Sequence, residues 1–276
     1  MFILAIETTG PYGSVALLDE KGNVLGYQVS RGTMSHLKDL IPMVDTVLKK
    51  CGVSKNEINL LAPSVGPGSF TGIRIGVSTA RALCQALGIK AVPVPALEAF
   101  CFKETALREA ARKFCGQAAE AACGRTSEAA CGKTAVCAII NARRGQVYGM
   151  IDGFMEPGPY MLTDVLHVYK EEMEPLGYKI LFFGDGIDAY EKDIVEALGT
   201  SGSEQEPCFE FAPKEDRYQD AVSVGRWAVE RIRQTSGLDG CTVDFENLLP
   251  DYMRRAEAEQ KLESGELPIC KGPKQE

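Results

Sequence analysis

Apolar and polar positions in the first third of the chain predict strands followed by helices. Short apolar runs at 2–6, 13–18 and 24–29 predict three strands, and the polar turn 19–23 joins the last two as an antiparallel pair. Further on, apolar residues recur at alternating spacings of four and three, which places them on one face of a helix. Strands that return after such helices indicate a mixed sheet covered by helices, so the pattern predicts an α/β protein.

The first predicted helix spans 34–51. Gly52 follows it as a stop, and Pro42, which lacks an amide hydrogen, is expected to kink it near its middle. His36 follows Ser35, a candidate N-cap, so we expect its ring to make a local hydrogen bond; a catalytic base is the alternative. The apolar face of this helix comprises Leu37, Ile41, Val44, Leu48 and Cys51.

The second predicted helix, 72–87, ends at Gly88. A line of small residues recurs at every fourth position on it, so another backbone could approach closely there. We therefore expect this helix to dock against a partner, and Gly76→Arg to weaken that contact without unfolding the protein. The small line comprises Gly72, Gly76 and Ala80, and the apolar face comprises Ile73, Val77, Ala80, Cys84 and Leu87.

A glycine-rich turn precedes the second helix. Gly66 and Gly68 can adopt positive φ, and the hydroxyl of Ser69 or Thr71 is available to cap the helix. Such a turn either exposes backbone N–H groups to a phosphate or caps a core helix tightly, and the spacing favours the structural interpretation.

The rest of the chain is punctuated by shorter elements. Three Cys-Gly pairs recur every eight residues, a spacing unlike that of zinc ligands, so we expect an exposed insertion there rather than a metal site. Strands are predicted at 60–65, 91–95, 134–140, 146–152 and 179–183, and a helix at 218–233.

Composition and charge narrow the function. The chain has 276 residues, is 45% hydrophobic and carries a net charge of −8, so it can bury a large core but makes a poor main clamp for phosphate backbones. No apolar run has the length of a membrane span, and the start lacks a basic flank, so we expect a cytoplasmic protein with no membrane contact.

Several motifs together resemble one family. The stretch Gly-Pro-Gly-Ser-Phe-Thr-Gly-Ile-Arg-Ile-Gly at 66–76 is similar to the signature of the TsaB (YeaZ) family, in the glycoprotease (M22-like) superfamily. The opening Ile-Leu-Ala-Ile-Glu-Thr, the run Asn-Ala-Arg-Arg-Gly-Gln-Val-Tyr at 141–148 and the stretch 250–259 resemble further family markers in the same order.

The resemblance implies the actin-like ATPase fold, shared with sugar kinases, Hsp70 and RNase H-like proteins, in two lobes of mixed sheet and helices. It places one lobe at 1–100, a second at 101–245 with the Cys-Gly insertion at 115–133, and a C-terminal tail at 246–276.

The resemblance also implies a function without catalysis by this chain alone. The family supplies a scaffold and activator to a TsaD-type catalytic paralogue, which transfers a threonylcarbamoyl group to N6 of an adenosine next to the anticodon of tRNA. A TsaE-type small ATPase completes the assembly, tRNA is contacted through the complex, and the chain alone forms a homodimer. The implied partner interface comprises His36, Leu37, Ile41, Val44, Leu48, Gly68, Ser69, Phe70, Thr71, Gly72, Ile73, Gly76 and Ala80.

The resemblance implies that the partner subunits, which use ATP and a metal, carry the cofactor chemistry. Polar residues stand at the first hairpin, where the wider fold holds phosphates, but the family has a closed or degenerate cleft, so we expect weak or absent hydrolysis. At the positions of the paralogue's two metal-binding histidines this chain has Ala96 and Phe100. The hairpin residues are Glu7, Thr8 and Ser14.

For two sets of side chains near turns, the sequence is compatible with two different roles. Arg143 and Arg144 are either solvated or contact a nucleotide or a partner, and Tyr252 and Arg254 dock on this chain's own surface or on a neighbour's. A small-molecule kinase or ATPase of the same fold is the alternative function. A metallopeptidase is the least favoured, because a histidine pair is missing.

Overall fold

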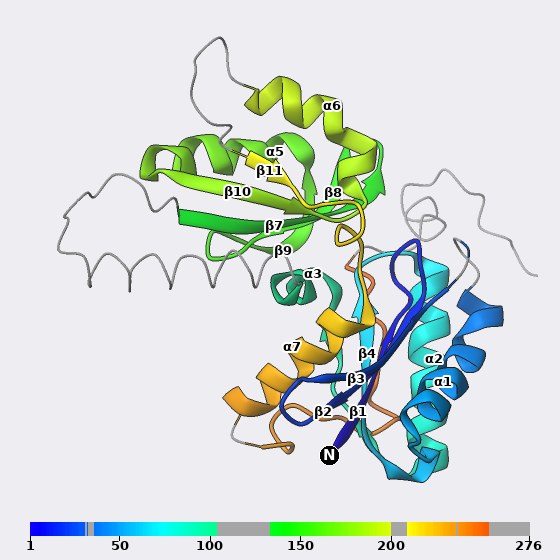
Figure 1. Cartoon of the computed structure of the whole chain (residues 1–276). Coiled ribbons are helices and arrows are strands. Elements are labelled where there is room, and N and C mark those ends of the chain that lie inside the picture. The colour runs from blue at the N-terminus through cyan, green and yellow to red at the C-terminus, as the bar shows by residue number, and fades with distance from the viewer. Residues whose placement is uncertain (31, 33–35, 104–132, 200–208, 236, 254–276) are drawn as a thin grey trace, which may run out of the picture.

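The computed structural model describes residues 1–30, 32, 36–103, 133–199, 209–235 and 237–253. These residues form two lobes, each built around one sheet (Figure 1). The strand order is β3-β2-β1-β4-β5 in the first sheet and β9-β8-β7-β10-β11 in the second, so both lobes repeat one topology. In each, an antiparallel meander of three strands is followed by two strands parallel to the first. The two-lobed α/β fold predicted from the sequence is confirmed.

Helices cover both faces of the first sheet, and its central strands are buried. Helices α1 (His36–Cys51) and α2 (Phe70–Leu87) cover one face, and α7 (Ala221–Gln234) covers the other (Figure 1). Because side chains alternate along a strand, Leu4 and Ile6 pack toward α1 and α2 while Ile3 and Ala5 pack toward α7. Its strands are β1 (Phe2–Glu7), β2 (Ser14–Asp19), β3 (Val24–Val29), β4 (Ile58–Gly66), β5 (Lys90–Ala91) and, paired with β4, β6 (Val94–Pro95).

The second sheet packs against helices of its own lobe on one face and against the short helix α3 (Ala96–Ala99) on the other. Phe100, in the 3₁₀ turn Phe100–Phe102 after α3, contacts Phe183 at a ring-centroid distance of 5.9 Å. The strands are β7 (Lys133–Arg143), β8 (Gln146–Ile151), β9 (Met155–Met161), β10 (Tyr178–Phe183) and β11 (Phe209–Phe211), and the covering helices are α5 (Leu162–Val168), a π-helical turn Tyr169–Met173, a 3₁₀ turn Glu174–Leu176 and α6 (Gly186–Leu198).

The chain after α7 returns along the first lobe as a strap, residues 237–253. Val243 pairs with Ala91, Leu248 is fully buried, and Asp251 N–H donates to the Val65 carbonyl at 2.8 Å. The first lobe therefore includes α7 and the strap. The sequence placed the end of the second lobe at residue 245, but the chain on both sides of this residue packs on the first lobe. The sequence of such a helix or strap does not indicate which lobe it packs on, because the strands that it contacts lie far away in the chain.

Helix ends follow their caps. Helix α2 begins two residues before the predicted start, because Ser69 is its N-cap and accepts from Gly72 N–H at 3.3 Å. It ends at Gly88, whose φ of 65° is left-handed, as predicted. Helix α7 begins at Ala221 rather than 218, since Asp220 caps it. The predicted strand 91–95 is divided into β5 and β6, while the Cys-Gly repeat lies almost wholly outside the described residues.

Candidate functional site

The turn between β1 and β2, residues 8–13, is the point where the predicted site residues meet. Both long helices start beside it: the His36 ring lies 3.1 Å from the Gly10 carbonyl, and Ser69 N–H donates to the Thr9 carbonyl at 2.8 Å. Gly66 and Gly68 have φ of 123° and 151°, which confirms the predicted positive-φ turn. Since the Ser69 and Gly72 amides are used within the chain, this supports the capping interpretation over a phosphate loop.

His36 is buried at the start of α1 and holds the turn in place. Its Nε2 donates to the Gly10 carbonyl when the ring is neutral, and Nδ1 faces Gly13, where an added Cβ would lie 2.7 Å away. Burial lowers the pKa of His36, although the Gly10 carbonyl opposes this. This bond joins residues 26 positions apart, so it is not the local bond predicted at the helix start; the imidazole instead joins α1 to the turn.

The three predicted cofactor-binding side chains all point into the chain's own contacts. The Thr8 hydroxyl donates to the Gly72 carbonyl at 2.8 Å, and the Ser14 hydroxyl accepts from Ala221 N–H at 2.9 Å. Glu7 accepts from Thr9 N–H; burial raises the pKa of its carboxyl, and the hydrogen bond from Thr9 only partly offsets this. A phosphate that contacted the Thr8 or Ser14 hydroxyl would have to displace these hydrogen bonds.

The small residues of α2 approach this chain's own backbone. A Cβ at Gly72 would lie 2.0 Å from the Thr8 carbonyl oxygen, and one at Gly76 would lie 2.2 Å from the Thr8 hydroxyl. Ala80 is fully buried in the first core. This corrects the expectation that the line Gly72, Gly76 and Ala80 faces a partner. The close approach that small residues permit is made by β1 and its turn.

The other predicted interface residues divide into buried and exposed sets. Leu37 is 78% exposed, Ile41 46% and Phe70 37%, and Thr71 is exposed beside them, while Gly68 and Ser69 are half-buried. The surface available to a partner is therefore narrower than predicted. The residues that instead lie in the chain's own interior are His36, Val44, Leu48 and Ile73.

Contacts among Phe70, Arg74 and Tyr252 join α2 to the strap. The Arg74 guanidinium carbon lies 4.0 Å from the Phe70 ring centroid, and Arg74 Nε donates to the Tyr252 hydroxyl at 3.1 Å. The Phe70 and Tyr252 rings are 4.7 Å apart. Tyr252 thus docks on this chain's own surface, which decides between the two interpretations for that residue; Arg254 lies outside the described residues.

Arg143 and Arg144 lie on the other lobe, at the turn between β7 and β8. Their φ angles are 66° and 55°, an uncommon region for non-glycine residues, and both side chains are exposed. Arg143 N–H donates to the Asn141 side chain at 2.8 Å, and Gly145 N–H donates to the Tyr190 hydroxyl at 3.1 Å. The turn is thus fixed by its own lobe.

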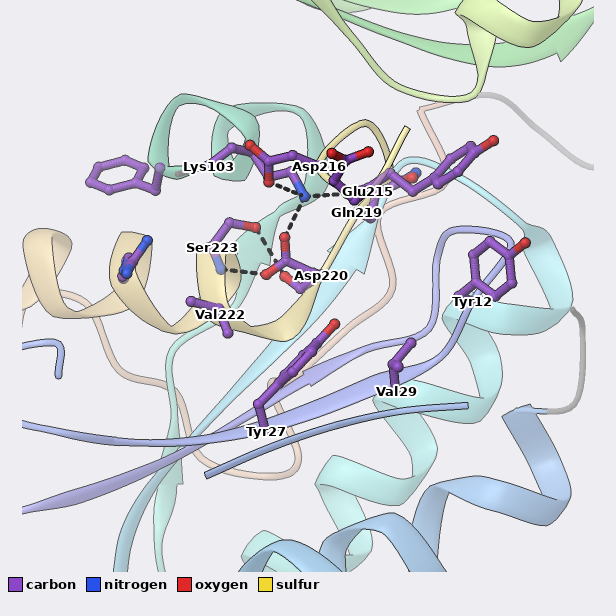
Figure 2. Close-up of a pocket in the computed structure, with 13 residues that line it drawn as sticks. Tyr12, Tyr27, Val29, Lys103, Glu215, Asp216, Gln219, Asp220, Val222 and Ser223 are labelled. Carbon is purple, nitrogen blue, oxygen red and sulfur yellow. Dashed lines mark hydrogen bonds and ion pairs between the residues drawn. The ribbon is translucent and has the colours of Figure 1, made fainter. Parts of the chain in front are cut away.

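A cavity of about 280 Å³ opens on the side of the first lobe away from α1 and α2, next to the junction of the lobes (Figure 2). Lys103, 3% exposed, lies at its wall and donates to the Tyr218 carbonyl at 2.5 Å, to Asp220, and to Asp216 at 3.3 Å. None of the predicted site residues lines this cavity. Sequence reasoning missed it because Lys103 stands more than 110 residues before its acidic partners.

Within the described ranges, no group of three or more His, Cys, Asp or Glu side chains is placed to hold a metal ion. Ala96 and Phe100 are buried apolar residues in the core around α3. Among the helices that the structure describes, none combines the length and apolarity needed to cross a membrane.

Comparison with protein-family models identifies the family of this chain. Residues 30–262 match the family model described as "TsaD: tRNA N6-adenosine threonylcarbamoyltransferase". The chain belongs to this family. Of its relatives, TsaB of Bacillus subtilis, a tRNA threonylcarbamoyladenosine biosynthesis protein, is 28% identical over 95% of this chain and 97% of its own length. TsaB of Haemophilus influenzae is 32% identical over 39% of this chain and 45% of its own length. The resemblance to TsaB is confirmed.

A solved structure shows the same fold for this member of the TsaD family. A Pseudomonas aeruginosa protein with similarity to peptidase YeaZ superposes with a TM-score of 0.62 at 21% identity, covering 92% of this chain and 99% of that one. At this identity the likeness concerns the fold alone.

Proposed function

We propose that this protein is the noncatalytic scaffold and activator in tRNA threonylcarbamoyladenosine biosynthesis. It would bind a TsaD-type catalytic paralogue, which transfers the threonylcarbamoyl group to N6 of an adenosine next to the anticodon. A TsaE-type ATPase would join the assembly, tRNA would be contacted through the complex, and the chain alone would form a homodimer. The observation that carries the proposal is the similarity to Bacillus subtilis TsaB over 95% of this chain and 97% of that protein.

The geometry supports a role without catalysis. Thr8 and Ser14, at the place where the wider fold holds phosphates, are hydrogen-bonded inside the chain, and Glu7 is fully buried beside them. Apolar Ala96 and Phe100 leave no imidazole to ligate a metal at that position. A kinase, an ATPase or a metallopeptidase is disfavoured on these grounds, and ATP and metal chemistry would belong to the partner subunits.

The outer face of α1 and the start of α2 would form the contact. Leu37 and Ile41 stand one turn apart on α1 and remain exposed, and Phe70 marks the first turn of α2 with Arg74 stacked on it. Aromatic residues and arginine are enriched at protein–protein interfaces, and exposed apolar side chains gathered on one face are typical of interaction sites. The two helices are held rigid by the turn at 8–13, so the face is formed before a partner binds.

The double substitution Leu37→Asp with Ile41→Asp is expected to weaken binding to the catalytic paralogue by at least about tenfold, because it places charges at a desolvated contact. The measurement is titration of the purified paralogue, with thermal unfolding of the variant to show that it folds. Leu176→Asp is the matched control, since Leu176 is 59% exposed on the second lobe. Equal affinities for the double variant and the wild type would place the contact elsewhere.

A further inference from the structure

The cavity beside the lobe junction lies outside the proposed partner surface. Helix α7 packs over β1 and β2 and leaves the outer face of the edge strand β3 open, so Tyr27 and Val29 remain 41% and 40% exposed. The opposite wall is formed by the first turn of α7 and by residues 215–220 before it, as Figure 2 shows. The space therefore arises because one helix covers only part of the sheet.

Aromatic rings make up much of the lining. Tyr12 and Tyr218 meet edge to face with centroids 5.6 Å apart, and Tyr27 and Phe102 contribute further rings. Figure 2 shows the Tyr27 hydroxyl directed from β3 toward Asp220. The faces of such rings carry partial negative charge and attract cations.

The charged groups around the cavity favour a cation over an anion. Three carboxylates line it, Glu215, Asp216 and Asp220, against two cations, Lys103 and Arg226. Asp216 and Asp220 pair with Lys103, so the exposed Glu215 is the carboxylate that the Lys103 cluster does not use. The three hydrogens of the Lys103 ammonium have three acceptors, and its side chain is 2% exposed, so it offers no donor to an anion. Partial burial raises the pKa of the Tyr27 hydroxyl to about 12, and the negative charge of Asp220 adds to this.

We propose that this cavity binds a small organic cation, an ammonium group carried on a compact apolar body. The tyrosine rings and Glu215 would take the charge, and Val29 and Val222 would contact the apolar part. A volume of about 280 Å³ lies near the lower end of the range for ligand pockets, so the ligand is small.

Titration of the full chain with choline and with its neutral isostere 3,3-dimethyl-1-butanol tests the charge requirement. The two probes have nearly the same shape and differ in the charge at the quaternary centre. Choline is expected to bind more tightly by about twofold to thirtyfold, the range of cation–π interactions, as measured by calorimetry at low salt. Equal binding of the two probes, or no saturable binding of choline, would overturn the proposal.

Variants of Tyr27 and Glu215 locate the binding. Tyr27→Leu should remove most of the preference for choline over the isostere, whereas Tyr27→Phe, which keeps the ring, should retain it. Glu215→Gln should weaken choline binding and its salt dependence. Because Tyr27 and Glu215 are both exposed, these variants are expected to fold, which thermal unfolding checks. Choline binding that is unchanged in Tyr27→Leu would place the cation elsewhere and contradict the assignment.

Discussion

Gly72→Ala is expected to destabilise the protein by about 3 kcal/mol, the upper part of the range for overpacking a rigid interior. In an exposed helix the same change would stabilise, since alanine is the better helix former. Here the new Cβ would lie 2.0 Å from the Thr8 carbonyl oxygen, and a backbone atom in the turn at 8–13 cannot rotate away. Denaturant unfolding followed by fluorescence of Trp227 measures the loss, and Ser78→Ala, on the exposed side of α2, is the control.

Gly76→Ala separates this cause from a general intolerance of the helix. Its Cβ would meet the Thr8 hydroxyl at 2.2 Å, a side-chain atom, so Thr8→Ala in the same chain should relieve most of the penalty. The Gly72→Ala penalty should persist in that background, because its obstacle is backbone. Gly76→Arg is likewise expected to unfold the protein, contrary to the prediction from sequence. A Gly72→Ala protein as stable as the wild type would contradict the packing of α2 on β1.

Lys103→Met is expected to cost about 3 kcal/mol of unfolding free energy, near the lower end of the range for removing one partner of a buried ion pair. The ammonium joins the end of the first crossing between lobes to the second crossing, through Asp216, Asp220 and the Tyr218 carbonyl. Its loss would leave two carboxylates side by side without a counter-charge. The same unfolding assay applies, because Trp227 lies on α7, directly after this segment.

Two further variants make the Lys103 result interpretable. Lys103→Met combined with Asp216→Asn should recover part of the loss, since it removes one uncompensated charge. Lys55→Met breaks the exposed pair of Lys55 with Asp45 at 3.0 Å and should change stability little. A Lys103→Met protein with unfolding unchanged from the wild type would show that this ammonium does not hold the crossings.

Local signals in the sequence were sufficient to predict the helices, strands and turns. They were insufficient to predict what these elements contact. The helix cap at Ser69, the left-handed Gly88 and the positive-φ glycines Gly66 and Gly68 act within a few residues, so sequence reasoning placed them well. The line Gly72, Gly76 and Ala80 was also read correctly as a close approach. Its partner was misassigned, because spacing shows that a backbone comes near and not whose backbone it is.

The cavity and the lobe boundaries depend on contacts between distant residues. Lys103 and Asp220 are separated by 117 positions, and Tyr12 meets Tyr218 across a still longer gap, so neither pairing has a local signal. Helix α7 shows the periodicity of an amphipathic helix, but that periodicity does not say which sheet it covers. The cavity and the lobe boundaries depend on how distant segments are arranged in space, and local sequence patterns do not show that arrangement.

Reconstituted tRNA modification with each subunit omitted in turn is the most direct test of the central claim. The account predicts that this chain alone forms no threonylcarbamoyladenosine, and that the catalytic paralogue with the remaining subunits gains activity when this chain is added. Leu37→Asp with Ile41→Asp should reduce that gain in step with its weaker binding. Formation of the modified nucleoside by this chain without the paralogue, or an unchanged rate when this chain is left out, would contradict the account.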